Sequence, residues 1–384
     1  MSDLHIQCPH FDICSGCTRN EYVDHLPMLD DANHFFAENG APFFKMQTGS
    51  ATGWRCRAKL AVRGTVAAPL IGLFAKGTHQ TINIPQCRVH HPAINRAMEI
   101  LRKWIMQYKI EPYDEVAATG LLRYVQASVE RKSGHIQLVI IINAKNVDDE
   151  ARHHLEALWQ AVPDLWHSIW LNLNTRRDNI IFGNEWIHIK GSFWLWETLN
   201  RQQICLHPAS FMQANLEMFD RLLQRIEHLL PEDADLLEFY AGVGAIGASV
   251  VEKCQKVQCI ELNQTAQKCF EETCRALSPN LAKRLSYLQG KSADHINLLN
   301  FMLVGKGVVL VDPPRKGLEK ELLKALCENK CVNNIIYVSC GWAAFQGDCQ
   351  SLLKAGWHIA HAEAFLFFPG SDHIEILAAF ERRI

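Results

Sequence analysis

Short apolar runs alternate with helical stretches from Asp235 onward, and this alternation constrains the fold of the chain more than any other feature. The apolar runs cover residues 236–240, 257–260, 308–311 and 335–339. Strands that alternate with helices in this way predict a parallel sheet covered by helices. We therefore expect an α/β, Rossmann-like domain over residues 201–384.

The first half of the chain has a different pattern. Its first 90 residues are rich in loops, and regular elements are expected mainly after them. The expected elements are strands over 59–64, 135–142 and within 168–186, and helices over 91–108 and 148–159. Because 384 residues are enough for two domains, we expect an α+β domain over 1–200, with the α/β domain opened by a helix near 213–230.

The first apolar run of the second half leads into a glycine-rich turn, Gly242-Val243-Gly244-Ala245-Ile246-Gly247. Glycines permit a tight turn and a close approach of a ligand to the backbone. Glu261 follows at the end of the next apolar run, where an acid can accept hydrogen bonds from both hydroxyls of a ribose. A dinucleotide and S-adenosylmethionine both fit this arrangement, and the reactive residues that come later favour the methyl donor.

Three of these later residues stand near the ends of expected strands. Asp312 precedes two prolines, which force the chain out of the sheet, and Cys340 follows the next run in the same way. Ligands of a parallel sheet bind beyond the carboxyl ends of its strands, so we expect both residues at the crevice of the glycine turn. The thiolate of Cys340 would be a nucleophile. Glu375, among apolar neighbours, should have a raised pKa and can act as a base.

Basic residues are concentrated in one segment of the chain. The net charge is only −2, yet residues 51–110 contain ten Lys and Arg and a single acid, Glu99. Such a local excess is typical of a surface that binds a polyanion. Arg55, Arg57 and Lys59 alternate along an expected strand, so all three are expected to face phosphates on one side.

The N-terminus lacks a basic stretch followed by an apolar run, and no segment approaches 18 uncharged apolar residues. Neither a secretory signal nor a membrane span is therefore expected, and we expect a reducing, cytoplasmic compartment. The 14 cysteines are then interpreted as free thiols, ligands or nucleophiles rather than disulfides. The spacing of Cys8, Cys14, Cys17 and the distant Cys87 fits both an iron–sulfur cluster and a closed zinc site.

Together, these motifs resemble those of the bacterial RNA (uracil-5-)-methyltransferase family. The resemblance spans the chain from Cys8 to Glu375, and within the family it is greatest to the branch that methylates a uridine of 23S ribosomal RNA. That branch carries a [4Fe–4S] cluster and lacks the N-terminal TRAM β-barrel, whereas the tRNA-directed branch generally lacks the cluster cysteines. The matching pieces are Gln213-Ala214-Asn215, the Gly242 turn, Asp312-Pro313-Pro314-Arg315, Tyr337-Val338-Ser339-Cys340 and Phe368-Pro369 followed by His373-Ile374-Glu375.

The resemblance implies S-adenosylmethionine-dependent methylation of uridine C5 in RNA. It makes Cys340 the nucleophile that adds to C6 and Glu375 the base that removes the C5 proton. With their basic segment and the cluster, residues 1–200 are the expected RNA platform, and the cluster is expected to be structural because methyl transfer from a sulfonium needs no electron. The implied ligand residues are Gln213, Tyr240, Gly242, Gly244, Glu261 and Asp312 for the methyl donor, and Cys8, Cys14, Cys17 and Cys87 for the [4Fe–4S] cluster.

The chain departs from the family pattern at four places, none of which removes a group that the chemistry requires. Ala241 replaces the usual cysteine and Glu238 the usual aspartate. The other two departures are Gly341-Trp342 for the usual Asn-Pro and Gly370-Ser371 for the usual His-Thr.

Other functions stay open at this point. They are a tRNA uridine-C5 methyltransferase, an RNA N-methyltransferase that acts on adenine or guanine, and a non-catalytic RNA-binding or folding factor that keeps the fold. An N-methyltransferase needs no nucleophilic thiol, so loss of Cys340 would separate it from a uridine-C5 enzyme. No feature of the sequence calls for an obligate protein partner.

Overall fold

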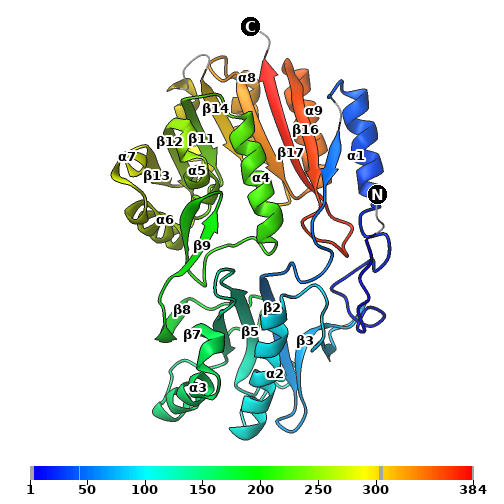
Figure 1. Ribbon diagram of the computed structural model, residues 1–384, viewed down its shortest axis with the longest axis vertical. Coiled ribbons are helices and arrows are strands. Elements are labelled where there is room, and N and C mark those ends of the chain that lie inside the picture. The colour runs from blue at the N-terminus through cyan, green and yellow to red at the C-terminus, as the bar shows by residue number, and fades with distance from the viewer. Residues whose placement is uncertain (1–3, 43, 302–305, 383–384) are drawn as a thin grey trace.

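The computed structural model describes residues 4–42, 44–301 and 306–382. It contains two large sheets, one in the upper and one in the lower half of Figure 1, and a β-hairpin beside them. The hairpin consists of β9 (Leu195–Leu199) and β10 (Gln202–Leu206). The segment 207–215 then connects the hairpin to the upper half of the molecule.

The upper sheet is mixed, whereas the sequence had led us to expect a sheet that is parallel throughout. Strands β11 to β15 run parallel, but β17 lies antiparallel between β15 and β16. The reason is the short connection 366–374, which contains no helix and therefore returns the chain in the opposite direction. In spatial order the strands are β1 (Lys45–Gln47), β16 (Trp357–Phe365), β17 (Glu375–Arg382), β15 (Asn334–Ser339), β14 (Gly307–Val311), β11 (Ala234–Phe239), β12 (Cys254–Glu261) and β13 (Leu285–Gln289).

Helices cover both faces of this sheet, as expected for a Rossmann-like domain. One face packs against α4, α5 and α6, and the other packs against α1, α8 and α9. The Asn215 side chain accepts a hydrogen bond from the Met218 N–H at 3.1 Å and so caps the start of α4. The bounds are α1 (Pro27–Glu38), α4 (Leu216–Leu229), α5 (Ala245–Ser249), α6 (Gln264–Ala276), α7 (Pro279–Ala282), α8 (Lys320–Glu328) and α9 (Trp342–Lys354), with 3-10 turns η2 (Val251–Lys253) and η3 (Ser292–Phe301).

Two N-terminal elements join the upper sheet although they lie within residues 1–200. Strand β1 pairs in parallel with β16 at the sheet edge. Helix α1 packs Phe35 and Phe36 against Trp342 at the start of α9. The sequence analysis expected neither element, because β1 is short and its partner strand lies more than 300 residues away in the chain.

The lower sheet is antiparallel except for β6 and β7, which run parallel and are joined through α3. Helices α2 and α3 confirm the two helices expected in this half, and they cover one face of the sheet. In spatial order the strands are β4 (Thr81–Asn83), β3 (Pro69–Phe74), β2 (Arg57–Gly64), β5 (Leu122–Val129), β6 (Ile136–Ile142), β7 (Trp166–Leu173) and β8 (Glu185–Gly191); the helices are α2 (Pro92–Gln107), α3 (Asp149–Ala161) and the 3-10 turn η1 (Pro163–Leu165).

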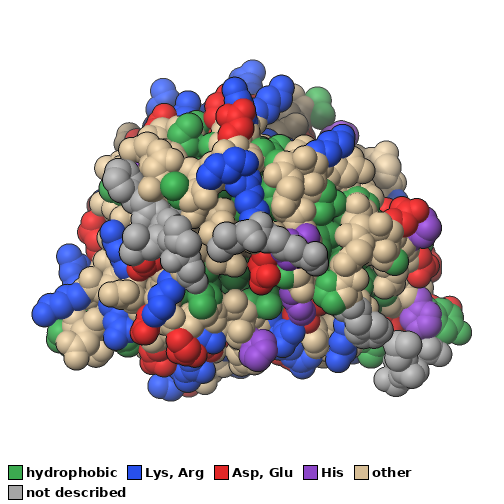
Figure 2. All heavy atoms as spheres, turned by 90° about the horizontal axis from the view of Figure 1, so that it is seen from above, with side chains coloured by type: hydrophobic (Ala, Val, Ile, Leu, Met, Phe, Trp, Pro, Cys, Tyr) green, Lys and Arg blue, Asp and Glu red, His purple; other side chains and the backbone are tan. Residues whose placement is uncertain are grey.

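The two halves meet where the parallel strands of the upper sheet end. The backbones of Arg55 and Asn215 form an isolated antiparallel β-bridge. The Trp54 ring packs edge-on against the Phe368 ring, with 5.9 Å between the ring centroids. The opposite end of the upper sheet, where these strands begin, shows acidic and basic side chains side by side in Figure 2. In the described part of the chain, no helix is long and apolar enough to cross a membrane.

Candidate active site

The glycine turn connects β11 to α5 through left-handed backbone. Tyr240, Gly242 and Gly244 have φ values of 61°, 55° and 74°. Besides its left-handed backbone, Gly244 lacks room for a side chain, because a Cβ there would lie 2.5 Å from the Phe270 ring. Glu261, at the end of β12, accepts the Gly242 N–H at 3.0 Å. The acid therefore ties the turn to the neighbouring strand.

A cavity of about 610 Å³ lies in front of this turn. It brings together every predicted donor-binding and catalytic residue except Gly244, which lies behind the turn at the start of α5. These residues come from the ends of different strands and from the segment before α4, as expected for ligand binding at the carboxyl edge of a sheet. They are Gln213, Tyr240, Gly242, Glu261, Asp312, Cys340 and Glu375.

The half-buried Cys340 and the buried Glu375 enter the cavity from the adjacent strands β15 and β17. Burial, followed by the negative charges of Glu375 and Asp312, raises the pKa of Cys340 to about 11. Burial and the charge of Asp312 also hold the pKa of Glu375 well above its usual range. A carboxylate whose pKa is raised is a stronger base, which suits a group that accepts a proton.

Asp312 and Arg315 place charges beside this pair. Burial raises the pKa of Asp312 to about 7. Arg315 lies close enough for its positive charge to lower the pKa values of Cys340 and Glu375. Cys340 is therefore flanked by two carboxyl groups and the cation of Arg315, in a cavity whose lining also includes Glu261, Glu319, Lys291 and Lys316.

A glycine follows Cys340 because the backbone at position 341 lies very close to the backbone of Arg315. A Cβ at this position would lie 2.3 Å from the backbone oxygen of Arg315. The chain after β15 thus passes directly over the chain after β14, and any larger residue would force one of the two segments to shift. The departure from the usual Asn-Pro is consistent with this close approach.

Sequence reasoning did not single out several residues that line the same cavity. Phe211 is 71% exposed, although it is a large aromatic residue at the rim. Lys291 and Ser292 follow β13, so the rule that ligands bind beyond strand ends could have found them. Glu319 is a further lining residue that the prediction missed, whereas Arg315 and Phe368 stand in motifs that the sequence analysis quoted without giving them a role.

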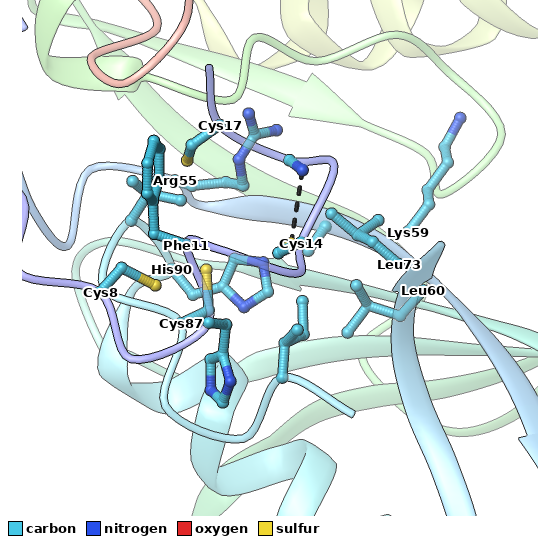
Figure 3. A pocket seen from close by; sticks show the side chains of 15 residues that line it. Cys8, Phe11, Cys14, Cys17, Arg55, Lys59, Leu60, Leu73, Cys87 and His90 are labelled. Atoms are coloured by element: carbon cyan, nitrogen blue, oxygen red, sulfur yellow. Dashed lines mark hydrogen bonds between the residues drawn. The ribbon is translucent and has the colours of Figure 1, made fainter. Parts of the chain in front are cut away.

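The four predicted ligand cysteines surround a second cavity, of about 240 Å³, in the lower half (Figure 3). Burial and then the neighbouring Cys87, Cys14 and Cys8 raise the pKa of Cys17 to about 11. Across residues 4–42, 44–301 and 306–382, however, no group of three or more His, Cys, Asp or Glu side chains is arranged to hold a metal ion. The four cysteines thus line one cavity, and their binding of a metal stays a prediction.

The three predicted phosphate ligands make different contacts, although Arg55 and Lys59 line the same cavity. Arg55 lines the cysteine cavity and lies over the Trp54 ring at 4.6 Å. Arg57 donates to the carbonyls of Ser210 and Pro208 at 2.7 and 2.8 Å, so its guanidinium holds the segment 207–215 and is not free for phosphate. Lys59 is exposed and points away from the cysteines in Figure 3. The expectation that all three face RNA thus does not fit Arg57.

The cavity in front of the glycine turn fits S-adenosylmethionine by its chemistry. Glu261 presents a carboxylate for ribose hydroxyls, and Tyr240 presents an aromatic ring. Asp312 has no hydrogen-bond partner within the described residues, so its carboxyl is available to the donor. The acidic surroundings suit a positively charged sulfonium group.

The fold and this site define a class of proteins, the S-adenosylmethionine-dependent methyltransferases with a mixed α/β fold. The structure is similar to that of the Pyrococcus abyssi tRNA (uracil-54, C5)-methyltransferase in complex with S-adenosyl-L-homocysteine. The TM-score is 0.75 at 22% sequence identity, over 96% of this chain and 86% of that chain. At this identity the likeness shows the shared fold.

The family model described as tRNA (uracil-5-)-methyltransferase matches residues 28–383. The chain therefore belongs to this family and is an S-adenosylmethionine-dependent RNA methyltransferase. An uncharacterized RNA methyltransferase of Protochlamydia amoebophila is 40% identical over 98% of both chains. Another, from Caldanaerobacter subterraneus, is 27% identical over 98% of this chain and 84% of the relative.

Proposed function

We propose that the protein methylates C5 of a uridine in 23S ribosomal RNA through a covalent Cys340 adduct. The observation that carries the proposal is that Cys340, Glu375 and Asp312 line the same cavity as the glycine turn and Glu261. A nucleophile, a base and the donor-binding residues are thereby within reach of one flipped pyrimidine.

The first step of the proposed reaction activates a weak nucleophile. Cys340 loses its proton, and its sulfur bonds to C6 of the uracil, which moves the C5–C6 electron pair into an enolate. C5 then becomes carbanion-like and attacks the donor methyl group, whose bond to sulfur breaks to leave S-adenosylhomocysteine. Covalent catalysis of this kind divides one difficult step into easier ones.

Glu375 completes the reaction. Its carboxylate takes the proton from the methylated C5, the C5–C6 double bond forms again, and the bond between C6 and the Cys340 sulfur breaks. The raised pKa of Glu375 supports this role, since a carboxylate whose pKa is raised is a stronger base. The enzyme returns to its starting state once Glu375 has passed that proton to solvent and the released Cys340 thiolate has taken one up, which replaces the proton that the thiol lost to solvent in the first step.

The donor is proposed to be held by Gln213, Tyr240, Glu261 and Asp312, with Gly242 and Gly244 shaping the turn. Glu261 binds the ribose and Tyr240 packs on the donor, while Asp312 faces both donor and base. The proposal is supported by the shared cavity and by the hydrogen bond from the Gly242 N–H to Glu261.

We further propose that Cys8, Cys14, Cys17 and Cys87 hold a structural [4Fe–4S] cluster. Support comes from the single cavity that all four line, although Cys87 is distant in sequence. Each cysteine of such a cluster binds a different iron, so the four sulfurs need not converge on one point. Iron and acid-labile sulfide in equal amounts in protein purified without oxygen would support the cluster, whereas zinc alone would contradict it.

A tRNA uridine is the second candidate target, because the matching family model and the Pyrococcus structure are both named for tRNA. The four grouped cysteines favour ribosomal RNA, since the resemblance associates them with that branch. Mass mapping of 5-methyluridine in ribosomal and transfer RNA, with and without the gene, distinguishes the two. A methyl group lost from tRNA alone would establish the second candidate.

The adduct is tested with RNA that contains 5-fluorouridine, because fluorine at C5 cannot leave as a proton. We expect wild-type protein and S-adenosylmethionine to give a protein–RNA complex that survives denaturant. The Cys340→Ala variant should give none, while Cys331→Ala, a change outside the cavity, should behave as wild type. Methyl transfer by Cys340→Ala at the wild-type rate would overturn the mechanism.

A further inference from the structure

We propose that the N-terminal segment 4–20, which carries three of the four grouped cysteines, positions the catalytic base Glu375. It does so through Gly370 and Asp372 in the connection 366–374. This inference rests on the proposed function of Glu375 and adds positioning residues, Arg19 and Asp372, to it. Neither belongs to the motifs from which the active site was predicted.

The segment and the connection are joined by direct contacts. The backbone N–H groups of Thr18 and Arg19 donate to the Gly370 carbonyl at 2.8 and 3.1 Å. The Arg19 Nε donates to Asp372 Oδ1 at 2.5 Å. These bonds link residues more than 350 positions apart in the chain. They hold the connection three residues before Glu375.

Gly370 makes this close approach possible. Its φ is +94°, and a Cβ would lie 3.0 Å from Ile6 Cδ1 and 3.2 Å from Cys17 Sγ. A histidine, the usual residue at this place in the family, would leave no room for the segment as it lies here. The close packing of Cys17 against the backbone at position 370 therefore depends on the glycine.

The position of Glu375 depends on its backbone. Among the described residues, no side chain or backbone group hydrogen-bonds to its carboxylate. On one side Glu375 pairs with Phe365 in the antiparallel register of β16 and β17. On the other side it follows the connection, which is tightened by bonds from Ser371 N and Oγ to the Phe368 carbonyl. The contacts from Thr18 and Arg19 attach the end of the connection nearest Glu375, whereas its other end is held by the bonds from Leu366 N to the Gln47 carbonyl and from Asn215 Nδ2 to the Phe367 carbonyl.

A displaced base has a distinct kinetic signature. Glu375 acts after Cys340 has added and the methyl group has moved, so its displacement should slow only the last step. The methylated RNA would then stay bonded to Cys340. A misplacement of about 1 Å can slow a step roughly 100-fold. A change that merely weakened folding would instead slow all steps together.

The Arg19–Asp372 pair can be removed with little risk to folding. The two side chains are 31% and 46% exposed, and exposed ion pairs contribute little to stability. The test uses the full-length protein as purified, ribosomal RNA from a strain that lacks the gene, and S-adenosylmethionine with a tritiated methyl group. The variants are Asp372→Ala, the conservative Asp372→Glu, Glu375→Gln and, as a matched control, Glu272→Ala, which breaks an ion pair with Arg275 on α6.

We expect Glu375→Gln to trap the label in a protein–RNA complex that survives denaturant. Asp372→Ala should give the same complex, with release slowed about tenfold or more and the initial methyl uptake unchanged. Asp372→Glu and Glu272→Ala should release as wild type does. Wild-type release by Asp372→Ala, together with trapping by Glu375→Gln, would overturn this inference alone. Failure of Glu375→Gln to trap any label would overturn the proposed function, and this inference with it.

Discussion

Cys340 and Glu375 stand opposite each other, one position beyond the Ser339–Ile376 pair that ends the antiparallel register of β15 and β17. The proposed nucleophile and base are thus placed by strand pairing. A slip of one residue would turn either side chain to the other face of the sheet. The same proximity explains why the charge of Glu375 adds to burial in raising the pKa of Cys340.

Arg315 should control the reactivity of Cys340. Its positive charge lowers the pKa of the thiol, which burial holds at about 11. Arg315→Gln should therefore leave less thiolate at pH 8 and slow alkylation of Cys340 by iodoacetamide about threefold. The effect is small because Arg315 is exposed and its charge is screened.

Peptide mass analysis of the alkylated protein measures this rate for Cys340 separately from the other cysteines. Arg315→Lys keeps the charge and serves as the control. In wild type the rate should rise about tenfold per pH unit from pH 7 to pH 9, since both values lie well below the pKa of about 11. A plateau within this range would contradict the raised pKa.

Asp312 should make the folded protein less stable as the pH rises. Its pKa is raised by burial from 3.8 to about 7, so between these values the unfolded chain loses a proton that the folded protein keeps. The stability contributed by the neutral acid is complete below pH 3.8 and is lost as the pH rises through 7. A difference of about three pH units corresponds to about 4 kcal/mol, which partial exposure reduces to roughly 2 kcal/mol.

Urea unfolding of wild type and Asp312→Asn tests this expectation. At pH 8 the variant should be more stable by roughly 2 kcal/mol, and near pH 4 the two should unfold alike. The variant should also bind S-adenosylmethionine more weakly, because the carboxylate that we propose to face the donor is lost. A stability difference that is the same at both pH values would show that the effect is not one of ionisation.

Gly244 and Gly242 should respond differently to the same substitution. Both have positive φ, but a Cβ on Gly244 would meet Phe270 at 2.5 Å, whereas a Cβ on Gly242 would meet nothing within 4 Å. Gly242→Ala should cost about 1 kcal/mol from backbone strain. Gly244→Ala should cost about 1–3 kcal/mol more, because the Cβ also overpacks the core.

Thermal unfolding measures both variants. The double variant Gly244→Ala/Phe270→Leu provides the internal control, since it removes the ring and should recover most of the additional loss. Equal destabilisation by Gly242→Ala and Gly244→Ala would show that Phe270 moves aside without cost.

Lys59 and Arg57 should affect different properties. Lys59 is exposed, so Lys59→Ala should weaken RNA binding and reduce the salt dependence of the affinity by about one released ion. Arg57 anchors Pro208 and Ser210, in the segment that leads to Gln213. Arg57→Ala should therefore weaken donor binding and stability with an unchanged salt slope.

Filter binding of ribosomal RNA at several salt concentrations, together with calorimetric titration of S-adenosylhomocysteine, separates these effects. Arg57→Lys should not rescue the loss, because lysine cannot donate to two carbonyls in the same fixed geometry. A reduced salt slope in Arg57→Ala would restore the original expectation that Arg57 contacts phosphate.

Several features of the site were predictable because they follow strand ends. Glu261, Asp312 and Cys340 each stand at or directly after an apolar run, and parallel strands bring such positions to one edge. The prediction that Arg57 faces phosphate does not fit the hydrogen bonds of its guanidinium, because alternation along a strand shows only which side chains share a face. It does not show that the segment 207–215 covers this face and accepts hydrogen bonds from the guanidinium.

The sequence by itself determined the alternation of strands and helices in the second half, the glycine turn and the chemical groups of the site, because these depend on local spacing. Only the tertiary structure decided that β17 runs antiparallel, that α1 and β1 join the upper sheet, and that the segment 4–20 packs against Gly370 and Asp372. These features depend on contacts between residues hundreds of positions apart, and periodicity within a single segment carries no information about its distant partners.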